Sequence, residues 1–303
     1  MLRFSLITPI FAPWEGAFPS FARNDMKLHH HAIALPAWLL VTCLALAACG
    51  QGGKAAGELA FDSLRLDCKK HVYGDTAMPA VTVGACFTYV KQASEEGMAQ
   101  AINARIIEHC FGHDYDQLPI DEAMKAYITG FMNDYLSEFD RMLCDDDELP
   151  QWMYEDSFDM HGNVVYYGGN LLTYRYEGWQ SIGGPNDYYF TLYLNIDLRT
   201  LQPVTLDSLF MDDTTDMLTD LLWNQLMSQT HCHSREEVED LGYCTVSELE
   251  PTKNIRLDRK GVTFHYNLFE IAPYVMGYTE ITLLWPVLQP LLRNYEDVVE
   301  LVR

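Results

Sequence analysis

The spacing of apolar residues changes at Trp152, from a helical period before it to an alternating one after it. Residues 98–110 and 124–139 place apolar side chains three or four positions apart, which is the repeat of one helical face. Beyond residue 160, segments rich in β-branched and aromatic residues are separated by glycine turns, as at Gly162-Asn163 and Gly168-Gly169-Asn170. The two periods in separate blocks predict an α+β fold.

The residues before the change predict a small strand–helix domain, which we place at residues 60–148. Ser94-Glu95-Glu96 is a helix-start signal and Gly112 a helix-stop signal. The expected elements are strands at 64–68 and 81–87, a helix from about 94 to 112, and a longer helix from about 121 to 144.

Residues 149–303 predict an antiparallel-sheet domain packed with helices. The run 266–288 is apolar and is broken by Pro273 and Gly277, so it is interpreted as strand, turn and strand with an architectural role. The expected elements are strands at 164–167, 171–176 and 188–198, helices at 213–228 and between Cys232 and Cys244, strands at 255–257, 262–269 and 279–284, and a helical turn at 286–292.

Residues 1–49 have the pattern of a targeting segment and are kept out of the fold prediction. Lys27 precedes an apolar stretch from Ala32 to Ala48, which ends in Leu46-Ala47-Ala48-Cys49. This ending resembles the bacterial lipobox and implies acylation at Cys49. We therefore expect an upstream extension and lipoprotein signal peptide at 1–49 and a flexible, glycine-rich tether at 50–59. Together they predict a lipid-anchored location in the cell envelope, facing the periplasm or the surface.

Six cysteines remain after Cys43 and Cys49 are set aside. An even number in an exported chain favours disulfides, although six cysteines allow fifteen connectivities. Pairing between sequence neighbours is the hypothesis, with Cys68–Cys86, Cys110–Cys144 and Cys232–Cys244 as the pairs.

The formal net charge of the 303 residues is −23. Such a surface repels nucleic acid and anionic lipid headgroups, and membrane contact is expected through the lipid anchor only. It favours a cationic partner, although a well-solvated surface with no partner explains the same charge.

The order of elements after Trp152 resembles a known domain. Residues 193–198, 204–210 and 269–274, followed by Gly277, are similar to the extracytoplasmic C-terminal domain of RsiV-type anti-sigma factors. That domain of unknown function also occurs in PdaC-type peptidoglycan deacetylases and in many bacterial lipoproteins. The resemblance covers about residues 152–292. It implies a recognition domain facing the envelope, which in RsiV-type members receives lysozyme.

This sequence departs from the family in one turn. Members tend to carry a Gly-Gly-Ala-His type turn where this chain has Gly183-Gly184-Pro185-Asn186, so the histidine is missing. No catalytic residue is therefore carried over, and no hydrolase or phosphate-binding motif is present. No cofactor is expected. His109 and His113 have the spacing of a metal pair, but Gly112 between them and the lack of a third ligand argue against a metal site.

Aromatic residues gather between Trp152 and Tyr193. Strand propensity explains most of them, but Tyr and Trp also stack on sugars and anchor protein interfaces. The candidate binding surface comprises Trp179, Gly183, Gly184, Asn186 and Tyr188.

The leading hypothesis is a lipid-anchored envelope protein without catalytic activity, which binds a cationic, lysozyme-like protein or a cell-wall glycan. The alternatives are a peptidoglycan-acting hydrolase and a structural subunit of an envelope complex.

Overall fold

A computed structural model describes residues 58–145, 155–181 and 187–303. The first half contains β1 (Ala60–His71), β2 (Ala80–Gln92), α1 (Met98–Phe111), α2 (Ile120–Asp145), β3 (Asp156–Gly168), β4 (Leu171–Ser181) and β5 (Tyr188–Asp197). The second contains β6 (Gln202–Pro203), α3 (Leu206–Leu209), α4 (Thr215–Thr230), α5 (Arg235–Asp240), β7 (Ile255–Leu257), β8 (Gly261–Tyr266), β9 (Thr279–Leu284), α6 (Trp285–Leu288) and α7 (Tyr295–Val302).

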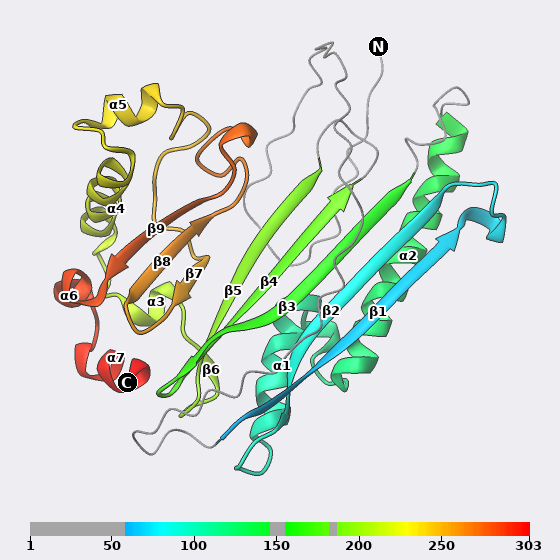
Figure 1. The fold of residues 1–303 in the computed structure, drawn as a ribbon, viewed down its shortest axis with the longest axis horizontal. Helices are drawn as coiled ribbons and strands as arrows, with labels where there is room; N and C mark the ends of the chain where they lie inside the picture. The colour runs from blue at the N-terminus through cyan, green and yellow to red at the C-terminus, as the bar shows by residue number, and fades with distance from the viewer. Residues whose placement is uncertain (1–57, 146–154, 182–186) are drawn as a thin grey trace, which may run out of the picture. The chain divides into compact units, whose positions relative to one another are not determined.

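Six strands form one large sheet in the order β1-β2-β3-β4-β5-β6. All neighbours are antiparallel except β2 and β3, which are parallel. A parallel pair needs a long crossover, and the segment with α1 and α2 supplies it. Both helices lie against the same face of the sheet (Figure 1), so the opposite face carries no helix from this crossover.

Alternation along the strands fills the core between the sheet and these helices. Phe87 of β2 is fully buried, and its ring lies 4.9 Å from that of Phe111 in α1. Phe158 of β3 meets Phe131 of α2 at 5.2 Å. These contacts confirm the alternating period predicted for the strands and the 3–4 period predicted for the helices.

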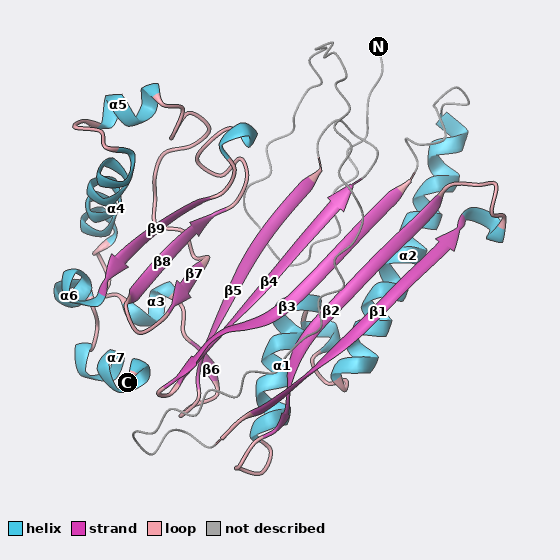
Figure 2. Cartoon of the chain, viewed as in Figure 1, coloured by secondary structure: helices cyan, strands magenta, loops and turns pink. Residues whose placement is uncertain are grey.

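The second sheet has three antiparallel strands, in the order β7-β8-β9. Helix α4 packs beside β9, and the helices α3 to α7, which are cyan in Figure 2, lie around this smaller sheet. The C-terminal helix α7, which the sequence did not predict, is joined to the β3–β4 turn by a hydrogen bond from the Asn170 amide to the Leu301 carbonyl. Gly169 in that turn has φ +59°, and a side chain there would collide with the backbone of Arg303.

The predicted α+β class is confirmed, but the boundary at 148/149 does not divide the sheet. β2, from the predicted N-terminal subdomain, pairs directly with β3 from the next one along seven positions, from Val81 with Asp156 to Phe87 with Gly162. Residues 60–148 and 149–303 therefore share one sheet.

The cysteines of the described residues carry free thiols at 68, 86, 110, 232 and 244. Cys68 is opposite Val83 and Cys86 is opposite Arg65, which puts the two thiols on opposite faces of the β1–β2 ladder. The Cys68–Cys86 pairing is thus excluded by the register.

Cys110 and Cys144 are also far apart along the helices. Phe111 packs on Tyr127 near the start of α2, and Cys144 lies about 25 Å further along that helix. The side chain of Cys144 lies outside the described ones. Cys232 and Cys244 both pack, with free thiols, against the core of the second sheet.

Residues 1–57, with Cys49 and most of the predicted tether, lie outside the described residues. Among the helices that are described, none has the length and apolar character needed to cross a membrane.

Candidate functional site

A groove of about 840 Å³ lies where the large sheet meets the loop between β8 and β9. Its floor comes from β3, β4 and β5, and its other wall from residues 267–278. The groove is lined from the floor by Asp159, His161, Glu177, Trp179, Tyr189 and Thr191, and from the wall by Asn267, Tyr274, Val275, Met276 and Tyr278.

The floor residues follow from the pleat of the sheet. Phe158, Met160, Tyr176 and Phe190 are buried toward the helices, so the alternate positions project from the opposite face. Strand pairing then aligns them in rows. Asp159, Trp179 and Tyr189 form one row across β3, β4 and β5, and His161, Glu177 and Thr191 form the next.

The wall is an irregular loop with exposed apolar side chains. Val275 is 89% exposed and Tyr278 is 64% exposed. Phe269 and Gly277 have φ values of +64° and +75°, which let the chain turn sharply on either side of the short helix Tyr274–Met276. The strand and core residues of 266–288 have the architectural role that the sequence indicated, but the loop of this segment also lines the groove.

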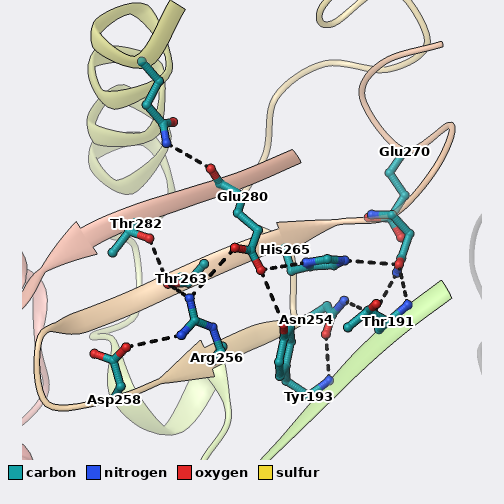
Figure 3. A network of polar contacts seen from close by, with 12 residues as sticks. Thr191, Tyr193, Asn254, Arg256, Asp258, Thr263, His265, Glu270, Glu280 and Thr282 are labelled. Atoms are coloured by element: carbon teal, nitrogen blue, oxygen red, sulfur yellow. Dashed lines mark hydrogen bonds and ion pairs between the residues drawn. The ribbon is translucent and has the colours of Figure 1, made fainter. Parts of the chain in front are cut away.

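Side-chain amides join the two sheets beside the groove (Figure 3). The Asn254 Oδ1 accepts from the Tyr193 amide at 3.0 Å, and its Nδ2 donates to the Thr191 carbonyl at 2.7 Å. The Asn267 Oδ1 accepts from the Thr191 amide at 2.7 Å. These amides form hydrogen bonds with the backbone N–H and C=O groups at the outer edge of β5, as a neighbouring strand would, and they set the position of the loop wall.

A third amide, from Asn195 of β5, lies deeper. Its Nδ2 donates to the Ile255 carbonyl at 2.8 Å, and its Oδ1 accepts from the Leu257 amide at 2.9 Å. The hydroxyl of Thr173 lies 3.1 Å from the same Oδ1. Asn195 and Thr173 are both buried, so this cluster attaches β7 to the large sheet.

His265 supports the wall from behind. It is buried, its ring stacks on Tyr278 at 5.2 Å, and Tyr193 packs edge-on at 5.5 Å. Its Nδ1 lies 3.2 Å from Glu280 Oε1 and its Nε2 lies 3.3 Å from Asn267 Oδ1. The hydrogen bond with His265 lowers the pKa of Glu280, whereas burial raises the pKa of Tyr193 to about 12.

Arg256 extends this network away from the groove. Its guanidinium lies 3.9 Å from Glu280 and 3.3 Å from Asp258, and it donates to the Thr263 hydroxyl at 3.2 Å. Every charged group that Figure 3 labels is thus placed against a partner, and the network supports the position of the wall.

The predicted binding surface is found in part. Trp179 lies in the groove, with its ring 6.5 Å from that of Tyr189. Tyr188 faces the helix side, where burial raises its pKa to about 12, so the groove receives its neighbour Tyr189 instead. Gly183, Gly184 and Asn186 lie outside the described residues.

The two histidines weighed as a metal site lie in different surroundings, with the end of α1 between them. His109 is partly buried, and this burial lowers its pKa to about 4, while His113 is exposed beyond Gly112, which has φ +99°. No group of three metal-ligating side chains occurs among the residues that the structure describes.

The groove floor offers two carboxylates with aromatic neighbours. Glu177 accepts a hydrogen bond from Arg175 at 3.1 Å, whereas Asp159 projects over Gly84 of β2. Glu177 is opposite His161, so the two carboxylates are diagonal neighbours with Cα atoms about 7–8 Å apart. This arrangement suits recognition of polar or cationic groups on a stacking platform.

Comparison with known proteins identifies the family of this chain. The model of the family described as "Protein of unknown function (DUF3298)" matches residues 207–285. A DUF3298 member from Bacteroides fragilis is 33% identical, with a TM-score of 0.77, over 82% of this chain and 99% of its own. A DUF3298 protein from Pseudomonas aeruginosa, 13% identical, shares the fold with a TM-score of 0.55, over 78% of this chain and 96% of its own. No curated protein matches the sequence. The chain belongs to the DUF3298 family, whose function is unknown.

Proposed function

We propose that this chain is a lipid-anchored protein of the bacterial envelope that recognises its ligand in the groove between the large sheet and the 267–278 loop. The observation that carries the proposal is the composition of the groove. Exposed aromatic rings from the floor and from the wall line one groove with two carboxylates, on a sheet surface that no helix of the crossover covers. Such a surface is typical of binding, because rings supply contact area and polar groups supply orientation.

The ligand class follows from charge and from resemblance. A chain of net charge −23 favours a cationic protein over an anionic polymer. The resemblance of residues 152–292 to RsiV-type and PdaC-type extracytoplasmic domains supports a lysozyme-like protein as the partner. A cell-wall glycan is the second ligand class, because Trp179 and Tyr189 would also stack on sugar rings.

The anchoring half of the proposal rests on Leu46-Ala47-Ala48-Cys49. Expressed in a bacterium fed with a labelled fatty acid, the chain is expected to incorporate label and to partition into detergent. The Cys49→Ser variant should lose the label, whereas Cys43→Ser, within the apolar stretch, should keep it. Label that persists in Cys49→Ser would refute acylation at this residue.

The binding half is tested on the full chain carrying Cys49→Ser, by calorimetric titration with lysozyme and, separately, with chitotetraose. Trp179→Ala and Tyr189→Ala are each expected to weaken binding of the true ligand about tenfold, since buried aromatic anchors dominate interface energies. Tyr73→Ala is the control, because Tyr73 is an exposed aromatic on the distant β1–β2 turn and should leave the affinity unchanged.

Absence of binding to both ligands at low salt would overturn the proposal. A hydrolase is the competing function, and the Asp159–Glu177 pair is the observation that favours it. Release of muropeptides from purified sacculi, lost in Glu177→Gln, would support the enzyme instead.

A further inference from the structure

The charges of the groove are unbalanced. Asp159 and Glu177 belong to its lining, and no lysine or arginine does. Two neighbouring arginines are bonded to other carboxylates: Arg175 donates to Glu177, and Arg65, which also attracts Asp159 through its charge, donates to Asp67 at 2.9 and 3.2 Å. The Asp159 carboxylate therefore leaves a negative charge at the floor of a partly enclosed space, where charge interactions are stronger than at an open surface.

Gly84 accounts for the position of this carboxylate. A Cβ at residue 84 would lie 2.1 Å from Asp159 Oδ1 and 3.6 Å from Asp67 Oδ1. Because Gly84 has no side chain, the Asp159 carboxylate can extend over the backbone of β2 at this position. Any residue larger than glycine at this position must displace the carboxylate.

Aromatic rings lie in the same row as Asp159. Trp179 is its direct neighbour on β4, and Tyr189 follows on β5, with the two rings tilted by 46°. Tyr274 and Tyr278 line the facing wall. A groove lined by a carboxylate and by aromatic rings is a site for an organic cation, since both the charge and the ring quadrupole attract it.

Resting on the proposed function, we propose that this row binds an arginine side chain of a partner polypeptide, with Asp159 as counter-ion and Trp179 and Tyr189 as stacking faces. Arginine fits better than lysine because a planar guanidinium pairs with a carboxylate at its edge while a ring covers its face. A neutral glycan would use the rings but would gain little from the charge.

The test titrates the full chain carrying Cys49→Ser with acetyl-(Arg)₃-amide and with acetyl-(citrulline)₃-amide, which has nearly the same shape without the charge. The arginine peptide is expected to bind, and the citrulline peptide to bind at least about tenfold more weakly. Asp159→Asn should weaken arginine-peptide binding about three- to fivefold, as expected for a partly exposed ion pair. Gly84→Ala should do the same without changing the net charge, because it moves the carboxylate.

Asp114→Asn is the matched control, since Asp114 is an exposed carboxylate beyond α1 on the helix side of the sheet. Equal binding of both peptides, or full affinity in Asp159→Asn, would overturn the arginine site. If Trp179→Ala still lost its binding to lysozyme or to chitotetraose in that case, the proposed recognition function would stand, and only the proposed chemistry of its ligand would be wrong. Thermal melting of each variant, compared with the parent chain, shows whether a loss of binding comes from misfolding.

Discussion

Replacing Gly162 by alanine is expected to lower the free energy of unfolding by about 2–3 kcal/mol. Gly162 lies in β3 on the helix side, where a Cβ would fall 2.2 Å from the Tyr174 hydroxyl and 2.4 Å from Phe87. Both neighbours are fully buried, and the Tyr174 hydroxyl donates to the Thr88 carbonyl at 2.8 Å. The added methyl must therefore displace core groups that have no free space to enter.

Gly130→Ala provides the control. Gly130 lies inside α2, and its nearest neighbour beyond the helix backbone, the Tyr115 hydroxyl, would be at an ordinary 3.6 Å. Because alanine is the better helix former, this variant is expected to gain about 0.5–1 kcal/mol. Urea unfolding of both variants gives the comparison. Equal stability of Gly162→Ala and the parent chain would show that the core between the sheet and the helices is not closely packed.

The elements of this fold could be predicted because their signals are local. Alternation marked β4 and β5, and the 3–4 spacing with Gly112 marked α1 and its end. The parallel pairing of β2 with β3 could not be predicted, because it joins segments that are separated by two helices. The Cys68–Cys86 pairing failed for a related reason: the faces that these two residues occupy depend on the register of β1 with β2.

The groove was predictable on one side only. Trp179 was identified because it lies in a stretch rich in aromatic residues. Polar residues also occupy alternate positions of β3 and β4, at Asp159, His161 and Glu177, and this pattern indicates a sheet face that is not covered. The facing wall was missed because its position is set by tertiary contacts. Asn254 and Asn267 place the loop against Thr191, and nothing in the local sequence of 267–278 specifies that neighbour.

Asn195→Ala is expected to cost about 3–4 kcal/mol and to weaken ligand binding in the groove as well. The change removes one donor and one acceptor from a buried cluster, so the Ile255 carbonyl and the Leu257 amide lose their partner. Each unsatisfied buried group costs about 1–3 kcal/mol. Because the same cluster attaches β7 to β5, its loss should also loosen the second sheet, which carries the 267–278 wall.

Asn133→Ala is the matched control for this prediction. Asn133 is exposed on α2 and accepts a single hydrogen bond, from Lys70 at 3.3 Å, so its replacement should change the free energy of unfolding by no more than about 0.5 kcal/mol. Urea unfolding measures the stability, and titration with the ligand identified for the groove measures the site. If Asn195→Ala were destabilised but bound its ligand normally, the contacts of Asn254, Asn267 and His265 would be enough to hold the wall. If its stability were also unchanged, the Asn195 amide would not be what joins the two sheets, and the hydrogen bond from the Thr173 hydroxyl to the Leu257 carbonyl would remain as the link at this point.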